Sequence, residues 1–233
     1  VKFGSFPRIV LENDERIKED LLKNYFQTIY IKDIVYANEL RNRKDVFDLL
    51  YYVISNSGKL FSYNKISKLL RIADKTIKEY IEYSKESFLI YELLKYDKSV
   101  KKQIANQKKI YCLDTGLINA ISFKFSEDYG RLLENIVFIN LIKNKNKIYY
   151  HKENHECDFI VKKGLNIIEA IQVTQSLDDP ETKKRELKGL IEAIDMHNLK
   201  TGLILTENEK DELIVANKKI IIKPIYEWLL ESS

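Results

Sequence analysis

The first part of the chain places apolar residues with the period of an α-helix. Apolar or aromatic positions from Ile17 to Val35 recur at three- and four-residue steps, which predicts a helix over residues 13–41. The segment KDVFDLLYYVISN predicts a second helix over residues 44–56, and Gly58 is a natural stop after it. The chain therefore begins as a helical region.

A pair of short helices follows. Ser62 or Asn64 can cap a helix at residues 65–71, a turn follows at 72–74, and a second helix is predicted from 75 to 84. Its apolar residues Ile77, Tyr80 and Ile81 share one face. Helix, tight turn and helix in this order predict a helix-turn-helix.

Two strands joined by a basic segment are expected next. FLIYELLKY at residues 88–96 and the segment 109–114 have strand patterns, and KSVKKQIANQK lies between them. Together with the helix pair they predict a winged helix, whose second helix enters the major groove while the wing meets phosphates. A packing module without DNA contact is the alternative. The residues expected to bind DNA are Lys75, Thr76 and Lys78 on the helix and Lys101, Lys102 and Lys108 in the wing.

From residue 114 onward, helices and strands alternate. This order predicts a mixed α/β sheet flanked by helices, so that the whole chain is of the α/β (α+β) class. The expected helices are 114–122, 127–144, 180–197 and 225–230, and the expected strands are 147–151, 156–162, 166–173, 200–206, 212–217 and 219–224.

Charge is distributed unevenly along the 233 residues. The net charge is +4, but residues 59–109 hold thirteen basic and six acidic side chains, a difference of +7, which leaves −3 for the rest. A local basic patch favours a polyanion such as DNA as the partner, and a solvated Lys-rich surface is the alternative. No apolar run reaches the roughly 20 residues of a membrane helix, so we expect no membrane partner and a cytoplasmic location. Cys112 and Cys157 are expected to be buried free thiols.

Acidic side chains mark the strands of the second half. Strand alternation puts Glu156 and Asp158 on one face of their strand, and Glu134 lies among apolar residues of a predicted helix. A helix Glu, a strand Asp and a further strand about ten residues later is the order found in metal-dependent nucleases. In such sites oxygen ligands hold Mg²⁺, which activates water and stabilises charge at the phosphate. Glu134 and Asp158 are therefore the candidate metal ligands.

The next strand departs from the nuclease pattern, which requires Glu-x-Lys on the face of the first Asp. If Gln172 takes the Lys position, Ala170 takes the Glu position; if Glu169 takes the Glu position, Ile171 replaces the Lys. A β-bulge would bring Glu169 and Gln172 onto one face. The candidate catalytic set of Glu134, Asp158, Glu169 and Gln172 is incomplete in either case.

Structural roles are the alternative for these polar residues. Glu134 and Asp158 could bond backbone amides or pair with Arg131 or Lys162, as acids on amphipathic elements usually do. Two histidines, His151 and His155, flank the strand that carries Asp158, and we expect both at the surface.

Motifs along the whole chain resemble archaeal ATP-binding proteins of the DUF4143 type. The matching stretches are FGSFPRIVL, YFQTIYIKDIV, TIKEYIEY, KKIYCLDTGL, GRLLENIVF, ECDFIV, AIQV and ETKKRELKGL. The resemblance implies an N-terminal P-loop ATPase domain, a winged helix and a PD-(D/E)xK nuclease-like domain. Because the sequence holds no Gly-x4-Gly-Lys-Ser/Thr motif, ATP would bind only through an N-terminal domain outside this sequence.

The resemblance and the missing initiator Met lead us to expect the C-terminal part of a longer ATPase. Its expected domains are a helical connector (1–43), a winged helix (44–118) and a nuclease-like domain (119–233). We expect DNA binding through the winged helix and a degenerate nuclease domain. An active Mg²⁺-dependent DNA endonuclease is one alternative. A protein-interaction module that assembles the ATPase, with the chain as a homo-oligomer, is the other.

Overall fold

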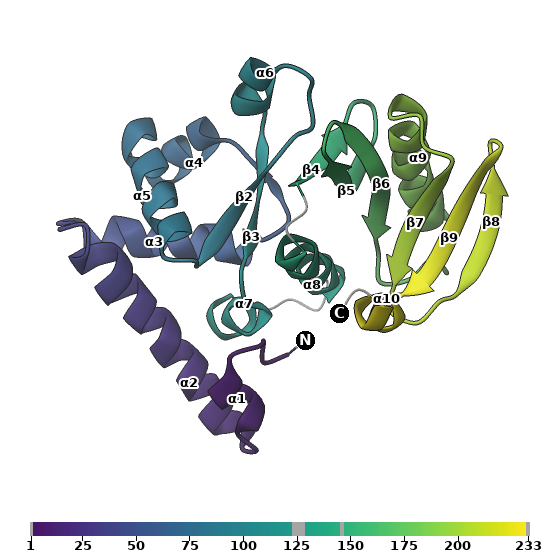
Figure 1. Ribbon diagram of the computed structural model, residues 1–233. Coiled ribbons are helices and arrows are strands. Elements are labelled where there is room, and N and C mark those ends of the chain that lie inside the picture. Colours follow the sequence, from purple (N-terminus) through teal and green to yellow (C-terminus); the bar gives the residue numbers. More distant parts are fainter. Residues whose placement is uncertain (1, 123–128, 145–146, 232–233) are drawn as a thin grey trace. The chain divides into compact units, whose positions relative to one another are not determined.

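The computed structural model describes residues 2–122, 129–144 and 147–231 (Figure 1). It divides into two compact units. Unit 1 comprises Val1–Glu92 and Gln107–Ser126, and unit 2 comprises Leu93–Asn106 and Glu127–Ser233. The helical segment 1–43 thus belongs to the same unit as the helix pair, while most of the segment between the two expected wing strands belongs to unit 2.

Unit 1 is mainly helical. Its central helix α3 buries Val46, Leu49, Leu50, Val53 and Ile54, because apolar residues at three- and four-residue steps share one face. The helices of unit 1 are α1 (Pro7–Leu11), α2 (Glu15–Thr28), η1 (Ile29–Tyr36), α3 (Arg43–Ser55), α4 (Tyr63–Leu70), α5 (Asp74–Glu86) and α7 (Thr115–Ile121). The single helix expected over residues 13–41 is α2 continued by η1, a π-helix.

Helices α4 and α5 form the expected helix-turn-helix pair. The Ser62 side chain caps α4 by accepting a hydrogen bond from the Lys65 amide at 3.3 Å. Arg71 ends α4 with a left-handed backbone at φ 58°, which turns the chain into α5. The inward faces bury Ile66 on α4 and Ile77 and Ile81 on α5.

A small sheet accompanies the pair. It has the strand order β1-β3-β2, with β1 (Leu60–Phe61), β2 (Ile90–Leu94) and β3 (Lys108–Cys112). The segment between β2 and β3, expected as an irregular wing, contains the short helix α6 (Val100–Ala105), which Ser99 caps. Short elements such as α6, α1 and β1 are not predicted from the sequence because they show no sustained hydrophobic period.

Asp114 joins the start of the chain to α7 within unit 1. Its carboxylate caps α7 by accepting bonds from the amides of Gly116 (2.8 Å) and Leu117 (3.3 Å). The other oxygen accepts from the amide (2.7 Å) and hydroxyl (3.1 Å) of Ser5. Gly4 allows this approach, since a Cβ there would lie 1.8 Å from the Asp114 carboxylate.

Unit 2 is built on a mixed sheet of six strands in the order β4-β5-β6-β7-β9-β8. Strands β4, β5 and β6 are antiparallel, β6, β7 and β9 are parallel, and β8 returns antiparallel to β9. The strands are β4 (Lys147–Lys152), β5 (Glu156–Lys163), β6 (Asn166–Val173), β7 (Thr201–Thr206), β8 (Asp211–Val215) and β9 (Lys218–Pro224). This arrangement confirms the expected mixed α/β class.

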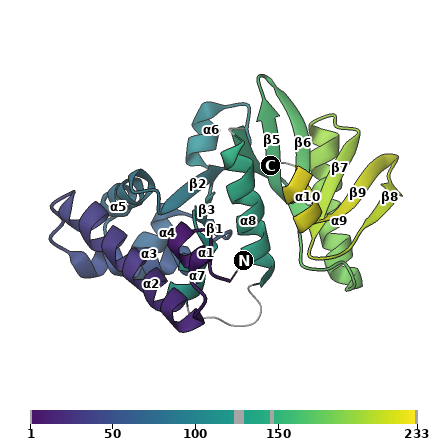
Figure 2. The ribbon, with the colours of Figure 1, turned by 60° about the horizontal axis from the view of Figure 1, so that its bottom comes forward.

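Helices cover both faces of this sheet (Figure 2). Helix α9 (Pro180–Met196) packs Leu190 and Ile194 against one face, where Ile160, Ala170 and Ile204 are buried. Helices α8 (Tyr129–Lys143) and α10 (Ile225–Glu231) pack against the other, where Phe138 of α8 lies 6.4 Å from Phe159 of β5 between ring centres. The first residues of the helix expected over 127–144 lie outside the described residues.

Two further expectations concern burial. Cys112 and Cys157 are buried and unoxidised, as expected, and burial raises the pKa of the Cys112 thiol to about 12. Within the described ranges, every helix is too short or too polar to span a lipid bilayer.

We predict that Asp114→Ala lowers the free energy of unfolding by about 2–4 kcal/mol, because the buried amide of Gly116 and the amide of Ser5 lose their shared acceptor, a carboxylate that is only 4% exposed. Chemical denaturation followed by circular dichroism measures this loss. Asp14→Ala is the matched control, since Asp14 also caps a helix but is exposed; its loss is about 1 kcal/mol. Equal losses in the two variants would show that Asp114 is an ordinary helix cap.

Candidate functional site

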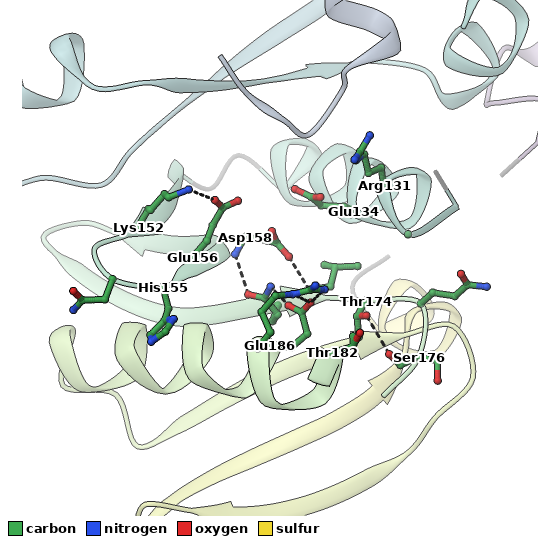
Figure 3. Close-up of a pocket in the computed structure, with 16 residues that line it drawn as sticks. Arg131, Glu134, Lys152, His155, Glu156, Asp158, Thr174, Ser176, Thr182 and Glu186 are labelled. Atoms are coloured by element: carbon green, nitrogen blue, oxygen red, sulfur yellow. Dashed lines mark hydrogen bonds and ion pairs between the residues drawn. The ribbon is translucent and has the colours of Figure 1, made fainter. Parts of the chain in front are cut away.

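Unit 2 contains a polar pocket at one end of its sheet (Figure 3). Its volume is about 760 Å³. Side chains reach it from α8, from the β4–β5 turn, from the facing ends of β5 and β6, and from the first turns of α9. Three of the four candidate catalytic residues, Glu134, Asp158 and Gln172, line it.

Asp158 and Gln172 lie side by side on β5 and β6. The register pairs Phe159 with Ile171 and Ile160 with Ala170, so the next pair along the antiparallel strands is Asp158 with Gln172. The Asp158 amide donates to Gln172 Oε1 at 3.2 Å, and the Val173 amide donates to Asp158 Oδ2 at 3.0 Å. One carboxylate oxygen of Asp158 is therefore engaged by the backbone of β6.

The network continues into helix α9. The amide nitrogen of Gln172 donates to Glu186, and Arg185 donates to the same carboxylate from Nη2 at 2.5 Å and Nε at 3.1 Å. Glu186 is buried, and burial together with the charge of Asp158 raises its pKa, while Arg185 and Gln172 oppose the shift. Arg185 and Glu186, which are ion-paired with each other, thus both belong to the pocket.

Further charged residues complete the lining. Glu134 and Arg131 contribute from α8, and Glu134 is only 8% exposed. Lys152 and Glu156 face the pocket from β4 and β5 and form an ion pair at 3.0 Å. The pocket therefore contains both acids and bases, which offset one another's charge.

Glu169 is not part of this pocket. It pairs with Val161 in the sheet and lies on the face opposite to Asp158 and Gln172. A register irregularity does occur in this hairpin, but it falls between the Val161–Glu169 pair and the Lys162–Ile167 pair. Because no shift separates Glu169 from Gln172, the bulge does not bring them onto one face, and the proposed catalytic grouping of these two residues is wrong.

The register changes how the nuclease pattern would align with this chain. Gln172 faces Asp158 and would stand at the second carboxylate position of that pattern, and Thr174, two residues further on, would stand at its Lys position. Thr174 donates its hydroxyl hydrogen to the Ser176 carbonyl at 3.2 Å. Thr174 was not among the candidates from the sequence because alternation along one strand does not fix the pairing across the β5–β6 turn.

These residues do not fit a bound Mg²⁺ in the arrangement described. Gln172 is neutral, and its oxygen already accepts a bond from the Asp158 amide. Glu186 is engaged by both Arg185 and Gln172. Over the described part of the chain, no three His, Cys, Asp or Glu side chains gather closely enough to hold a metal ion.

The candidate DNA-binding residues lie in different surroundings. On α5, Lys78 pairs with Asp74 at 2.5 Å and Lys75 approaches Glu79 at 3.9 Å, and Thr76 between them is half-buried. Lys101 and Lys102 are exposed on α6 of unit 2.

Lys108 of β3 lies over the Tyr63 ring, 4.8 Å from its centre. Burial lowers the pKa of this lysine. The ring contact and this burial give Lys108 a packing role within unit 1.

The structure places a stronger cationic row on α4. Lys65, Lys68 and Arg71 recur at three-residue steps and are exposed, and α4 carries no acid. Helix α5 instead has three lysines and four acids, a sum of −1. We call Lys65, Lys68 and Arg71 the α4 row.

The histidines differ from expectation in one case. His155 is exposed as expected, but His151 is buried, and its Nε2 lies 3.0 Å from Glu192 Oε1. The ring of His197 packs edge-on against His151, with 5.6 Å between ring centres. The surface assignment of His151 is therefore wrong, because Glu192 of α9 provides a partner that its sequence neighbourhood did not reveal.

Comparisons with known proteins place the chain in a family. The model of the family described as Domain of unknown function (DUF8612) matches residues 1–128, so the chain belongs to that family. An uncharacterized protein of Methanocaldococcus jannaschii is 34% identical over 99% of this chain and 54% of its own length. An uncharacterized protein of Haemophilus influenzae is 28% identical over 99% of this chain and 56% of its own length. No solved structure matches.

These findings correct the family assignment made from the sequence. The matching model is DUF8612 and not DUF4143, and the relatives are described only as uncharacterized, so the P-loop ATPase, its ATP and an ATPase partner domain have no support. The chain spans about half the length of the curated relatives it matches.

We predict that Gln172→Glu gives the pocket a response to Mn²⁺ and that the natural chain shows no such response. A third carboxylate beside Asp158 and Glu186 should cost about 1–3 kcal/mol of stability, since like charges repel in a partly buried site. Mn²⁺ should reverse this loss by neutralising the acids. Thermal unfolding with and without Mn²⁺ measures both effects.

Gln175→Glu is the matched control for this variant. Gln175 lines the same pocket but is exposed, so its substitution should change stability by no more than about 0.5 kcal/mol and create no Mn²⁺ response. Stabilisation of the natural chain by Mn²⁺ to the same extent as Gln172→Glu would contradict the assignment of Gln172.

Proposed function

We propose that this member of the DUF8612 family binds duplex DNA through the helix pair α4–α5 and that its nuclease-like pocket does not cleave the DNA. Binding is the function of unit 1. The pocket of unit 2 retains the position of a nuclease centre but not its chemistry. The single observation that supports DNA binding best is the α4 row.

The α4 row suits a phosphate backbone. Lys65 and Lys68 are three residues apart, so their side chains project from neighbouring positions along α4, and Arg71 follows at the residue that ends the helix. Among the described residues, none of the three forms an ion pair with an acid. Their charges remain available to phosphates, and neutralising phosphates releases counterions from DNA, which drives association.

Helix α5 makes a smaller electrostatic contribution under this proposal. Its exposed Lys75 and Lys78 already have acidic neighbours on the same helix, so much of their charge is offset. In helix-turn-helix proteins the first helix crosses the backbone and the second contacts bases. The distribution of charge here agrees with that division, since the phosphate-binding charge lies on the first helix.

The absence of cleavage follows from the identity of the pocket residues. Metal-dependent hydrolysis needs carboxylates that hold the ion and a group that activates or orients water. The second carboxylate position holds Gln172, and the Lys position holds Thr174. Asp158, Gln172 and Glu186 instead satisfy one another, the backbone and Arg185.

An active Mg²⁺-dependent DNA endonuclease is the second candidate. It is favoured by the presence of three carboxylates, Glu134, Asp158 and Glu186, around one pocket. For this function, Arg185 would have to leave Glu186, and the metal ion would have to take the place of the positive charge of Arg185. Assembly with other protein chains through unit 1 is a third candidate, which binding measurements separate from the first.

We predict that replacing Lys65, Lys68 and Arg71 by Ala weakens binding to a labelled DNA duplex by about 10-fold or more at 0.1 M salt. The slope of log affinity against log salt should fall by roughly one for each phosphate that is no longer neutralised, up to about three. Fluorescence anisotropy over a series of salt concentrations gives both quantities.

The double variant Lys75→Ala, Lys78→Ala is the matched control. It removes two exposed lysines from the adjacent helix, but because these are paired the loss of affinity should be smaller. Salt-independent binding, or a larger loss in the control than in the α4 variant, would overturn the assignment. A folded natural chain that binds no DNA would favour the assembly function.

A further inference from the structure

The sheet of unit 2 carries a second pocket on the face opposite to Asp158. Its volume is about 420 Å³. It is lined by residues of strands β6, β7 and β9 and of helix α10. Glu169, excluded from the nuclease-like pocket, lies here. The residues that surround it include Thr201, Leu203, Ile221, Lys223 and Trp228.

Glu169 is a partly buried carboxylate without a partner among the described residues. No hydrogen bond or ion pair reaches it in that part of the chain. Burial raises its pKa, and no cation in the described part of the chain opposes the shift. Removing a carboxylate from water without giving it a partner costs free energy. A ligand that pairs with the carboxylate would offset this cost.

Lys223 is the one lysine that lines this pocket among the described residues, and it is already engaged. Lys223 Nζ lies 2.9 and 2.7 Å from the two carboxylate oxygens of Glu231, so its charge is offset at the rim. Together Glu169, Glu231 and Lys223 sum to −1. This balance disfavours an anionic ligand and leaves Glu169 as the unmatched charge.

Aromatic and apolar surface surrounds that charge. Trp228 is 9% exposed and lines the pocket from α10, and Leu203 and Ile221 line its floor from adjacent strands. The Thr201 hydroxyl adds a polar group at the register position next to Glu169. A carboxylate beside an indole is the combination that binds organic cations, by ion pairing at one end and cation–π or apolar contact along the other.

We propose that this pocket binds an organic monocation, an alkylammonium or guanidinium group, which pairs with Glu169 and packs its alkyl part against Trp228. The site is separate from the nuclease-like pocket and does not depend on DNA binding. Its ligand requires both a positive charge and an apolar chain, because Glu169 supplies the charge and Trp228, Leu203 and Ile221 supply the apolar wall.

The sequence offers a direct probe, since Trp228 is the single tryptophan of the chain. Its fluorescence should change in a saturable manner when the protein is titrated with n-butylammonium or n-butylguanidinium. Uncharged n-butanol, which has the same alkyl chain, should bind at least about 10-fold more weakly because it cannot pair with Glu169. The titrations use the natural chain near pH 7.5.

Glu169→Gln should weaken the binding of both cations by at least about 10-fold, because the substitution removes the charge that pairs with them. The protein should stay folded, because this charge has no partner among the described residues. Glu212→Gln is the control, because Glu212 is an exposed acid on β8, the edge strand beside β9 in the same sheet. Thermal unfolding establishes that each variant is folded. Equal responses to butanol and the cations, an unchanged affinity in folded Glu169→Gln, or no response in the natural chain would overturn the proposal.

Discussion

The chemistry of unit 2 depends on one set of hydrogen bonds across the β5–β6 hairpin. Asp158 and Gln172 are held together because the Asp158 amide donates to Gln172 and the Val173 amide donates to Asp158. Glu186 and Arg185 extend the set into α9. A pocket whose polar groups satisfy one another inside the protein has less to offer a metal ion, because binding would first have to break these bonds.

The same hairpin explains why part of the site could not be predicted from the sequence. Hydrophobic period was sufficient to predict helices such as α3 and α9 and the positions of the strands of unit 2 along the chain, and the alternation of helices and strands predicted the mixed α/β class. The order of those strands in the sheet was not predicted. Register is not local: the regular pairing from Phe159–Ile171 to Val161–Glu169 keeps Glu169 off the face of Gln172, and only this pairing with β5 excludes a bulge between the two residues. For the same reason the buried contact of His151 with Glu192, 41 residues away, could not be anticipated.

Charge shows a similar difference between sequence and structure. The basic excess of residues 59–109 is correct as a sum, but acids on α5 offset its lysines, while the residues of the α4 row pair with no acid in the described part of the chain. An ion pair within one helix reduces the charge that a phosphate experiences, so the position of acids matters as much as the count of bases. In unit 2, burial raises the pKa of both Glu186 and Glu169, but the two acids differ in their partners. Glu186 has Arg185 and Gln172, whereas Glu169 has no partner among the described residues.

The central claim is that the chain holds DNA without hydrolysing it. The most direct measurement is cleavage of plasmid and linear duplex DNA by the natural chain with Mg²⁺ or Mn²⁺, beside Asp158→Ala, at concentrations where DNA binding is complete. The claim predicts intact DNA in both samples. Cleavage by the natural chain that Asp158→Ala abolishes would contradict it and establish a working metal site around Asp158, Glu134 and Glu186.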